Sequence, residues 1–407
     1  MIIHLNRVRT ALAVVAFVVA AVFLAATLQT GVADAKPKKQ GPGGLAFYKP
    51  PKKTPRQHGR LIWTNKATGV VPLKSARWTK KVLYTSTTPG GKRTAVSGSV
   101  SIPKGKAPKG GWPMITYGHG TTGIADKCAP SRNTANGPAT SYISYTDAEQ
   151  NAWLKAGYAV ARSDYQGLGT PGVHPFLIGK ASGRSMLDIV RASRDLDPRI
   201  SKRFLIAGHS QGGHAALFAA GEAAKWTPDL KLRGTVAYAP ASHLRLQAGS
   251  LPILTAPSSL TALAALIVKG ASAVDPAIDA SQLLSDPVLA FYPQTDRECL
   301  SRLAEPDNLG GIAPSELIRG GANTEPLFDL LDQQNPDVKT AAPILLAQGE
   351  EDDTTFPFLT DMLNDELVAL GDSVSYIKYP GVDHGGVLDA AKGDAMSFFQ
   401  ERLPSGR

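Results

Sequence analysis

The sequence has few cysteines and lacks the common motifs of a metal site. Its 407 residues include two cysteines, Cys128 and Cys299, and contain no CxxC and no HExxH motif. Common zinc motifs have closely spaced cysteines or a histidine pair at helical spacing. We therefore predict no metal and no cofactor, and the absence of a nucleic-acid-binding motif predicts no nucleic-acid partner.

Acidic residues are absent from a long stretch near the N-terminus. Between Lys36 and Ala125 the chain has 18 lysines and arginines and no aspartate or glutamate, while the whole sequence has a net charge of +10. Residues 36–59 are also rich in proline and glycine, which predicts a basic flexible arm. The pattern favours a solvated tail. The alternative is an electrostatic tether, through residues 36–60, to an anionic envelope or lipid surface.

The first 35 residues have the pattern of a signal peptide. Arg7 and Arg9 precede an apolar run over residues 11–28, and Ala33-Asp34-Ala35 then offers a small-x-small cleavage site. We therefore expect a secreted or envelope-bound protein, and an oxidising compartment predicts that its two cysteines form a disulfide. The apolar run is also long enough to span a bilayer, so a retained anchor is the alternative.

Strand and helix signals follow a regular order from residue 60 onward. Two β-rich runs joined by a Pro-Gly-Gly turn come early, and strands then alternate with helices, which is typical of a parallel sheet. Predicted strands lie at 61–63, 81–86, 95–102, 113–117, 158–163, 203–207, 234–239, 343–347 and 374–378. Predicted helices lie near 146–156, 183–195, 212–225, 358–370 and 388–402. We predict an α/β fold with a mostly parallel central sheet flanked by helices.

One segment interrupts this alternation. Residues 241–340 contain no clear strand and are rich in alanine, leucine, serine and proline. We expect an inserted α-helical cap between two parts of the core, residues 60–240 and 341–407, with a purely structural insertion as the alternative. A bond between Cys128 and Cys299 would attach this cap to the loop after strand 113–117.

The clearest chemical motif is Gly208-His209-Ser210-Gln211-Gly212. This G-x-S-x-G sequence lies between a hydrophobic strand and an Ala-rich helix, where a sharp turn exposes the serine hydroxyl. Small residues are needed two positions to each side of the serine because neighbouring backbones come very close. The helix N-terminus behind the serine favours developing negative charge. Ser210 is therefore the predicted nucleophile.

A serine hydroxyl needs a general base and an acid that orients the base. In this strand–turn–helix context, the acid and then the histidine follow the serine along the chain. Of the two histidines beyond the nucleophile helix, His243 begins the predicted cap, whereas His384 lies in a Gly-rich loop after the last predicted strand. His384 is therefore the predicted base. The acid belongs to the four carboxylates at 350–353, where a G-x-x-D spacing favours Asp352 over Asp353.

An oxyanion intermediate would need two backbone N–H donors. Gln211 directly follows the serine and supplies one, and the loop at 118–123 supplies the other from Thr121, with Thr122 as the alternative. His119 in this loop is interpreted as a stabilising residue. The sequence at 167–172 matches G-x-G-x-x-G, but Pro171 prevents a helix from beginning there, so no dinucleotide site is predicted.

Several of these segments together resemble the secretory lipases, a branch of the α/β-hydrolases. The similarity rests on HGTTGIADKCAPS at 119–131, DYQGLGTPGVHP at 164–175, GRS at 183–185, AVSG at 95–98 and the elbow at 208–213, and it extends over about residues 59–400. It implies carboxylic-ester hydrolysis, commonly of acylglycerols, beneath an α-helical cap. The match departs at the acid loop, where Phe356-Pro357 comes one residue later than the family pattern Q-G-x-x-D-x-x-V/T-P, so Asp352 and Asp353 both stay open.

These features predict a secreted serine ester hydrolase, a lipase or an esterase, that works through Ser210, His384 and Asp352. Its partner would be an ester or lipid substrate, and the sequence indicates no oligomeric state. One alternative is a peptidase or amidase with the same catalytic groups. Another is an inactive hydrolase-fold protein that binds the cell envelope through its basic arm.

Overall fold

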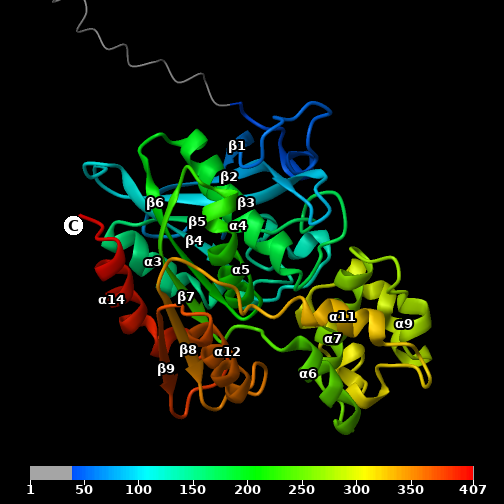
Figure 1. Ribbon diagram of the computed structural model, residues 1–407. Helices are drawn as coiled ribbons and strands as arrows, with labels where there is room; N and C mark the ends of the chain where they lie inside the picture. Colours follow the sequence, from blue (N-terminus) through cyan, green and yellow to red (C-terminus); the bar gives the residue numbers. More distant parts are fainter. Residues whose placement is uncertain (1–38, 407) are drawn as a thin grey trace, which may run out of the picture. The chain divides into compact units, whose positions relative to one another are not determined.

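A nine-stranded sheet runs through the protein (Figure 1). The computed structural model describes residues 39–406, so the predicted signal peptide lies outside the described residues. The strands are β1 (Leu61–Lys66), β2 (Ala76–Thr87), β3 (Arg93–Pro103), β4 (Trp112–Gly118), β5 (Ala159–Ser163), β6 (Ile200–His209), β7 (Lys231–Tyr238), β8 (Ile344–Gly349) and β9 (Val374–Tyr379).

The sheet begins antiparallel and becomes parallel. Its order is β1-β2-β3-β5-β4-β6-β7-β8-β9, with antiparallel pairing as far as β5 and parallel pairing from β5 to β9. Every residue of β4, β5 and β8 is buried, as expected for parallel strands that are covered on both faces. The predicted succession of strands along the chain and the mostly parallel sheet are confirmed.

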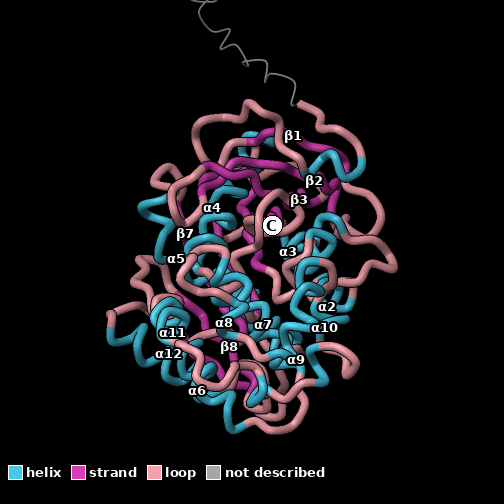
Figure 2. The backbone as a smooth tube through the Cα atoms, turned by 90° about the vertical axis from the view of Figure 1, so that its right-hand side faces the viewer, coloured by secondary structure: helices cyan, strands magenta, loops and turns pink. Residues whose placement is uncertain are grey.

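Helices cover both faces of the sheet (Figure 2). On one face, α4 (Gly179–Leu196) and α5 (Gln211–Trp226) pack against residues such as Phe204 and Ile206 of β6. On the other face, Leu205 of the same strand packs with α3 (Asp147–Ala156) and α14 (Lys392–Arg402). Successive residues of β6 thus pack into the hydrophobic cores on opposite faces of the sheet, because side chains alternate along a strand. Within residues 39–406, no helix is both long enough and apolar enough to cross a membrane.

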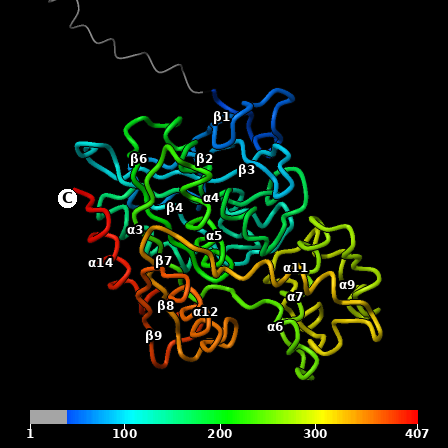
Figure 3. Tube along the Cα trace, viewed as in Figure 1, coloured from blue at the N-terminus to red at the C-terminus, as the bar shows by residue number. Residues whose placement is uncertain are grey.

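A helical insertion follows β7 and precedes β8, beside the sheet (Figures 1 and 3). Its helices are α6 (Leu244–Ser250), α7 (Ser259–Ser272), α8 (Ala280–Leu283), α9 (Asp286–Phe291), α10 (Leu300–Leu303) and α11 (Glu325–Asp332). They supply most of a second hydrophobic cluster, which Ile124, Phe176 and Leu177 from loops of the core complete. The predicted disulfide is present: Cys128, after β4, is bonded to Cys299 just before α10, with the two Cα atoms 5.5 Å apart. The insertion is therefore joined to the core by a disulfide as well as by its two chain connections.

The segment predicted as a flexible arm packs against the sheet over its described part. Phe47 and Tyr48, in a short 3-10 helix (Gly44–Tyr48), are buried in a cluster with Trp63 and Leu83. The Trp63 indole donates to the Phe47 carbonyl oxygen at 2.9 Å. Composition predicted flexibility because proline, glycine and lysine dominate this segment, but two aromatic side chains are enough to attach it.

Candidate active site

Ser210 occupies a strained turn between β6 and α5. Its φ is +59°, in the left-handed region that residues other than glycine seldom adopt. The Ser210 backbone N–H donates to the carbonyl oxygen of Tyr238 at 2.9 Å, which ties the turn to β7. Such strain persists only where the surroundings hold it, and it is common at reactive residues.

Close backbone contacts explain the small residues of the motif. A Cβ atom on Gly208 would lie 2.0 Å from the carbonyl oxygen of Gly212, and one on Gly212 would lie 2.0 Å from the carbonyl oxygen of Gly118. Strand β4, strand β6 and the first turn of α5 therefore meet without room for a methyl group. Close approach of neighbouring backbones is also the reason that the sequence analysis gives for the glycines at positions 208 and 212.

His384 and Asp352 form a hydrogen-bonded pair. His384 Nδ1 lies 2.7 Å from Asp352 Oδ2. Asp352 is buried after β8, whereas the neighbouring Asp353 is exposed. The geometry thus brings His384 together with Asp352 rather than with Asp353.

The Asp352 carboxylate is stabilised in its charged form. Burial raises its pKa, but the hydrogen bond and charge of His384 and the backbone N–H groups of Thr355 and Thr354 outweigh that effect, so the pKa lies below its usual value. The two N–H groups donate to Oδ1 at 2.8 and 2.9 Å. A charged Asp352 would hold the His384 proton on Nδ1 and leave Nε2 unprotonated.

His209, the residue before Ser210, bridges two other loops. Its Nε2 lies 2.8 Å from the carbonyl oxygen of His384, and the Tyr145 hydroxyl lies 2.8 Å from its Nδ1. A carbonyl accepts only, so Nε2 carries the proton and Tyr145 donates to Nδ1. Burial, and then the nearby His384, lower the pKa of His209 to about 3, which keeps it neutral. Sequence reasoning missed this role, because no spacing signal links residue 209 to residues 145 and 384.

A second histidine holds the side chain that follows Ser210. Gln211 Nε2 donates to His174 Nε2 at 2.9 Å, and His174 Nδ1 donates to the Gln166 carbonyl oxygen at 2.8 Å. Burial lowers the pKa of His174 to about 4, so its imidazole remains a neutral acceptor. His174 belongs to the loop containing G-x-G-x-x-G, which is mostly buried. The helix after it, α4, begins only at Gly179.

An apolar cavity of about 390 Å³ opens beside Ser210. Thr121 and Gln211, the predicted oxyanion donors, line it together with Ser210, whereas Thr122 does not. The rest of the wall comes mainly from the insertion, including Leu263 and Ile267 of α7, and no charged residue contributes. The carbonyl oxygen of Thr122 instead accepts from Leu300 of the insertion at 3.0 Å.

The two other histidines considered from the sequence, His243 and His119, lie outside this arrangement. His243 lies at the start of the insertion, where its Nε2 is 3.1 Å from Glu366 Oε1. His119 is buried, with Nδ1 2.7 Å from the Gly120 carbonyl oxygen. Among residues 39–406 the Ser210 hydroxyl has no hydrogen-bond partner. The structure therefore shows no hydrogen bond between Ser210 and His384. Within the same range, no group of histidine, cysteine, aspartate and glutamate could hold a metal ion.

Similar folds occur among solved structures of lipases and esterases. Candida antarctica lipase A in its closed state aligns with a TM-score of 0.72 at 18% identity, over 86% of this chain and 83% of that one. The rice cell wall degrading esterase LipA from Xanthomonas oryzae gives 0.66 at 18% identity, over 85% and 98% of the two chains. A hydrolase of unproven activity from Legionella pneumophila gives 0.68 at 21% identity, over 84% and 99%. These likenesses establish the fold.

Sequence comparison gives a narrower result. No curated protein sequence matches the chain. The family model described as secretory lipase matches residues 135–272, which include the Ser210 turn and the first part of the insertion. The match confirms the predicted resemblance: the chain is similar to the secretory lipases and has the α/β-hydrolase fold.

Proposed function

We propose that this protein is an exported serine ester hydrolase, with Ser210 as nucleophile, His384 as general base and Asp352 as the orienting acid. The observation that carries the proposal is the 2.7 Å contact between His384 Nδ1 and Asp352 Oδ2, in a site where a strained serine faces an apolar cavity. The secretory-lipase match supports both the reaction class and export. The exporting segment would be residues 1–35.

The reaction would proceed by acyl transfer. His384 Nε2 takes the Ser210 proton as the serine oxygen attacks the ester carbonyl carbon. The N–H groups of Thr121 and Gln211 would stabilise the resulting oxyanion. When the carbon–oxygen bond breaks, His384 returns its proton to the departing alcohol. Water then attacks the acyl-enzyme by the same route, which releases the carboxylic acid and restores Ser210.

The apolar wall favours an ester with a hydrocarbon acyl chain over a peptide. Each methylene buried in such a cavity contributes about 0.8 kcal/mol, whereas no charged side chain is available there to recognise a polar substrate. We propose that residues 241–340 act as a cap, since α7 and α11 supply much of this wall. Acylglycerols are the expected natural substrates.

The test is hydrolysis of p-nitrophenyl esters from C2 to C16 by the chain beginning at residue 36. Ser210→Ala should abolish turnover, whereas Ser193→Ala should not, because the Ser193 hydroxyl only donates to Ile189 within α4. Activity on long chains would identify a lipase and activity confined to short chains an esterase. If wild type hydrolysed no ester, or if Ser210→Ala remained active, the proposal would be wrong. Preferential turnover of amide substrates would support the peptidase or amidase alternative.

A further inference from the structure

A groove of about 630 Å³ lies at the end of the sheet opposite to Ser210. Ser210 follows the carboxyl end of β6, whereas the groove surrounds the amino ends of β6 and β7 and the turn before β4. Five basic side chains line it, and no acidic one does: Arg194, Arg199, Lys202, Arg203 and Lys231. The charge is thus concentrated around a hollow rather than spread over a convex surface.

The fold itself gives no reason for this concentration of charge. Arg203 and Lys231 are register partners on adjacent parallel strands, which run about 4.8 Å apart. Like charges on neighbouring strands repel and destabilise a sheet. A ligand that carries negative charge would remove this repulsion.

Most of the charge is not neutralised within the protein. Arg199 pairs with Asp197 at 2.7 Å, and Arg194 donates to the carbonyl oxygen of Ile200. In the described part of the chain, no carboxylate lies within ion-pairing distance of Lys202, Arg203 or Lys231, and all three are exposed.

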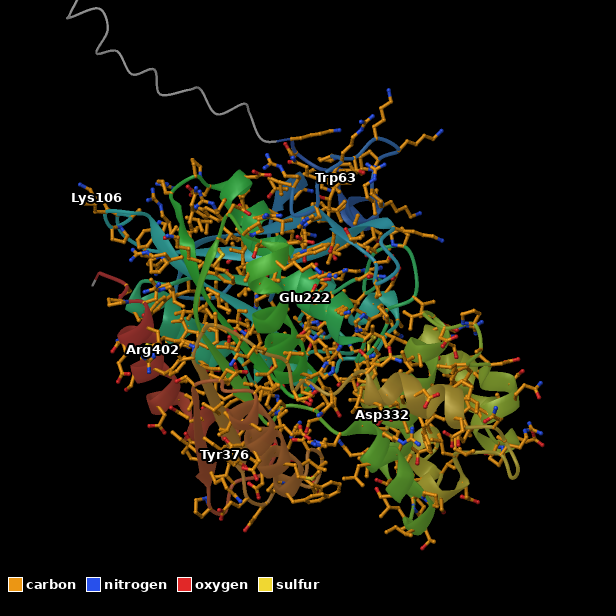
Figure 4. All side chains as sticks on the ribbon, viewed as in Figure 1. Trp63, Lys106, Glu222, Asp332, Tyr376 and Arg402 are labelled. Atoms are coloured by element: carbon orange, nitrogen blue, oxygen red, sulfur yellow. A yellow bond between two sulfur atoms is a disulfide. The ribbon has the colours of Figure 1, made fainter. Side chains whose placement is uncertain are left out.

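More basic residues extend the charge beyond the groove. Lys106 and Lys109, both exposed, lie on the loop between β3 and β4 that forms one groove wall. Figure 4 shows Lys106 at the end of the molecule away from Asp332 and the helical insertion.

We propose that this groove binds an extended polyanion that carries phosphate groups, and so anchors the protein with its apolar cavity facing away. Guanidinium groups bind phosphate oxygens through paired N–H donors, and several cations in one groove favour a ligand with several anionic groups. A polymer fits better than a bilayer, because the strength of binding to a bilayer interface grows with the apolar area that it buries as well as with charge. The groove lining has no large exposed hydrophobic side chain; Ile253 and Phe358, which are exposed, belong to the insertion and α12 (Pro357–Ala369). This binding is independent of ester hydrolysis.

The experiment measures the anisotropy of fluorescently labelled inorganic polyphosphate titrated with the chain from residue 36. The groove variant is Lys202→Glu with Lys231→Glu. Its control is Lys52→Glu with Lys53→Glu, which makes the same charge change at exposed residues of the N-terminal segment. The groove variant should weaken binding at least about tenfold and lower the salt dependence by about two phosphate contacts, while the control changes affinity less than about twofold. A Tm no lower than that of wild type and unchanged p-nitrophenyl ester hydrolysis would show that both variants fold.

Three results would overturn the proposal. The first is equal weakening by both variants, which would indicate net charge alone. The second is no polyphosphate binding by wild type at about 100 mM salt, where a multiply contacted polyanion should still bind. The third is binding to phosphatidylglycerol vesicles, lost in the groove variant, without polyphosphate binding, which would assign the groove to a bilayer. Since Ser210→Ala should bind polyphosphate like wild type, failure of the hydrolase proposal would leave this test intact.

Discussion

The imidazole of His209 donates from Nε2 to the main-chain oxygen of His384 at 2.8 Å, across 175 positions of sequence. The residue before the proposed nucleophile therefore holds the loop that carries the proposed base. Tyr145 completes the arrangement, because its hydroxyl fills the acceptor on the other side of the His209 ring.

Removing this bridge should impair the chemical step more than substrate binding. We expect His209→Ala to lower kcat about tenfold to a hundredfold, which corresponds to about 1–3 kcal/mol, with KM changed less than about twofold. Tyr145→Phe should have a smaller effect in the same direction, and His209→Asn, which keeps an N–H donor, should recover part of the loss. Steady-state kinetics on a p-nitrophenyl ester provide the measurement. A rise in KM with unchanged kcat would mean that His209 shapes the substrate site instead.

The acid loop offers a matched pair of substitutions. Asp352→Asn should lower kcat by about 10³–10⁴, because an amide favours the wrong His384 tautomer. Asp353→Asn should remain within about twofold of wild type, since Asp353 is exposed and its carboxylate contacts only the Thr354 hydroxyl. The two variants differ from wild type by the same loss of charge. Similar activities for both would contradict the pairing of His384 with Asp352.

The cavity predicts dependence on acyl-chain length. Ala264 of α7 lines the wall, so Ala264→Phe should fill part of the volume. We expect kcat/KM for C12–C16 esters to fall at least about tenfold while C2–C4 esters stay within about twofold, because only long chains would need the filled region. The ratio of the two activities is the readout, which cancels any loss of active protein. An equal loss at every chain length would place the acyl chain elsewhere.

Acid should destabilise the protein through its buried histidines. Burial lowers the pKa of His119, His174 and His214 to about 4 and that of His209 to about 3. As pH falls below about 6.5, these histidines become protonated in the unfolded chain but remain neutral in the folded chain. The histidine contribution to the free energy of unfolding is therefore complete above that pH and is lost progressively toward pH 4, by up to about 3 kcal/mol for each histidine.

Buried carboxyls whose pKa is raised oppose this loss, and Glu149 is one of them. Burial raises the pKa of Glu149 to about 8, so the folded state binds its proton more readily and gains stability as pH falls from about 8 toward 4.5. Glu149→Gln should therefore steepen the decline in the free energy of unfolding between pH 7 and 5, measured by urea titration. Constant or increasing wild-type stability over that range would contradict the neutral-histidine arrangement.

Local signals predicted the sheet well. The strands are visible because parallel strands buried on both faces need continuous apolar runs, and β8 (ILLAQG) is an example. The turn at Ser210 was visible for a similar reason, since only glycines fit where β4, β6 and α5 meet. The pairing of Cys128 with Cys299 required only that two cysteines be present.

Contacts between distant segments could not be predicted in this way. The burial of Phe47 depends on Trp63 and Leu83 at the sheet edge, and the composition of its own segment indicates the opposite. The Tyr145–His209–His384 bridge depends on how three loops meet in space. The basic groove combines the end of one helix, the starts of two strands and a loop, none of which is unusual alone.

The contacts of Gly118, Gly208 and Gly212 have a consequence for how such a protein can diversify. A side chain at any of these positions would displace the backbone around Ser210, so this part of the sequence tolerates little drift. The cavity wall is supplied largely by another stretch of chain, the helices between β7 and β8, whose residues can be exchanged without disturbing those glycines. The residues that shape the cavity can therefore change in evolution independently of those that position Ser210. New substrate specificities should arise by change in the insertion alone.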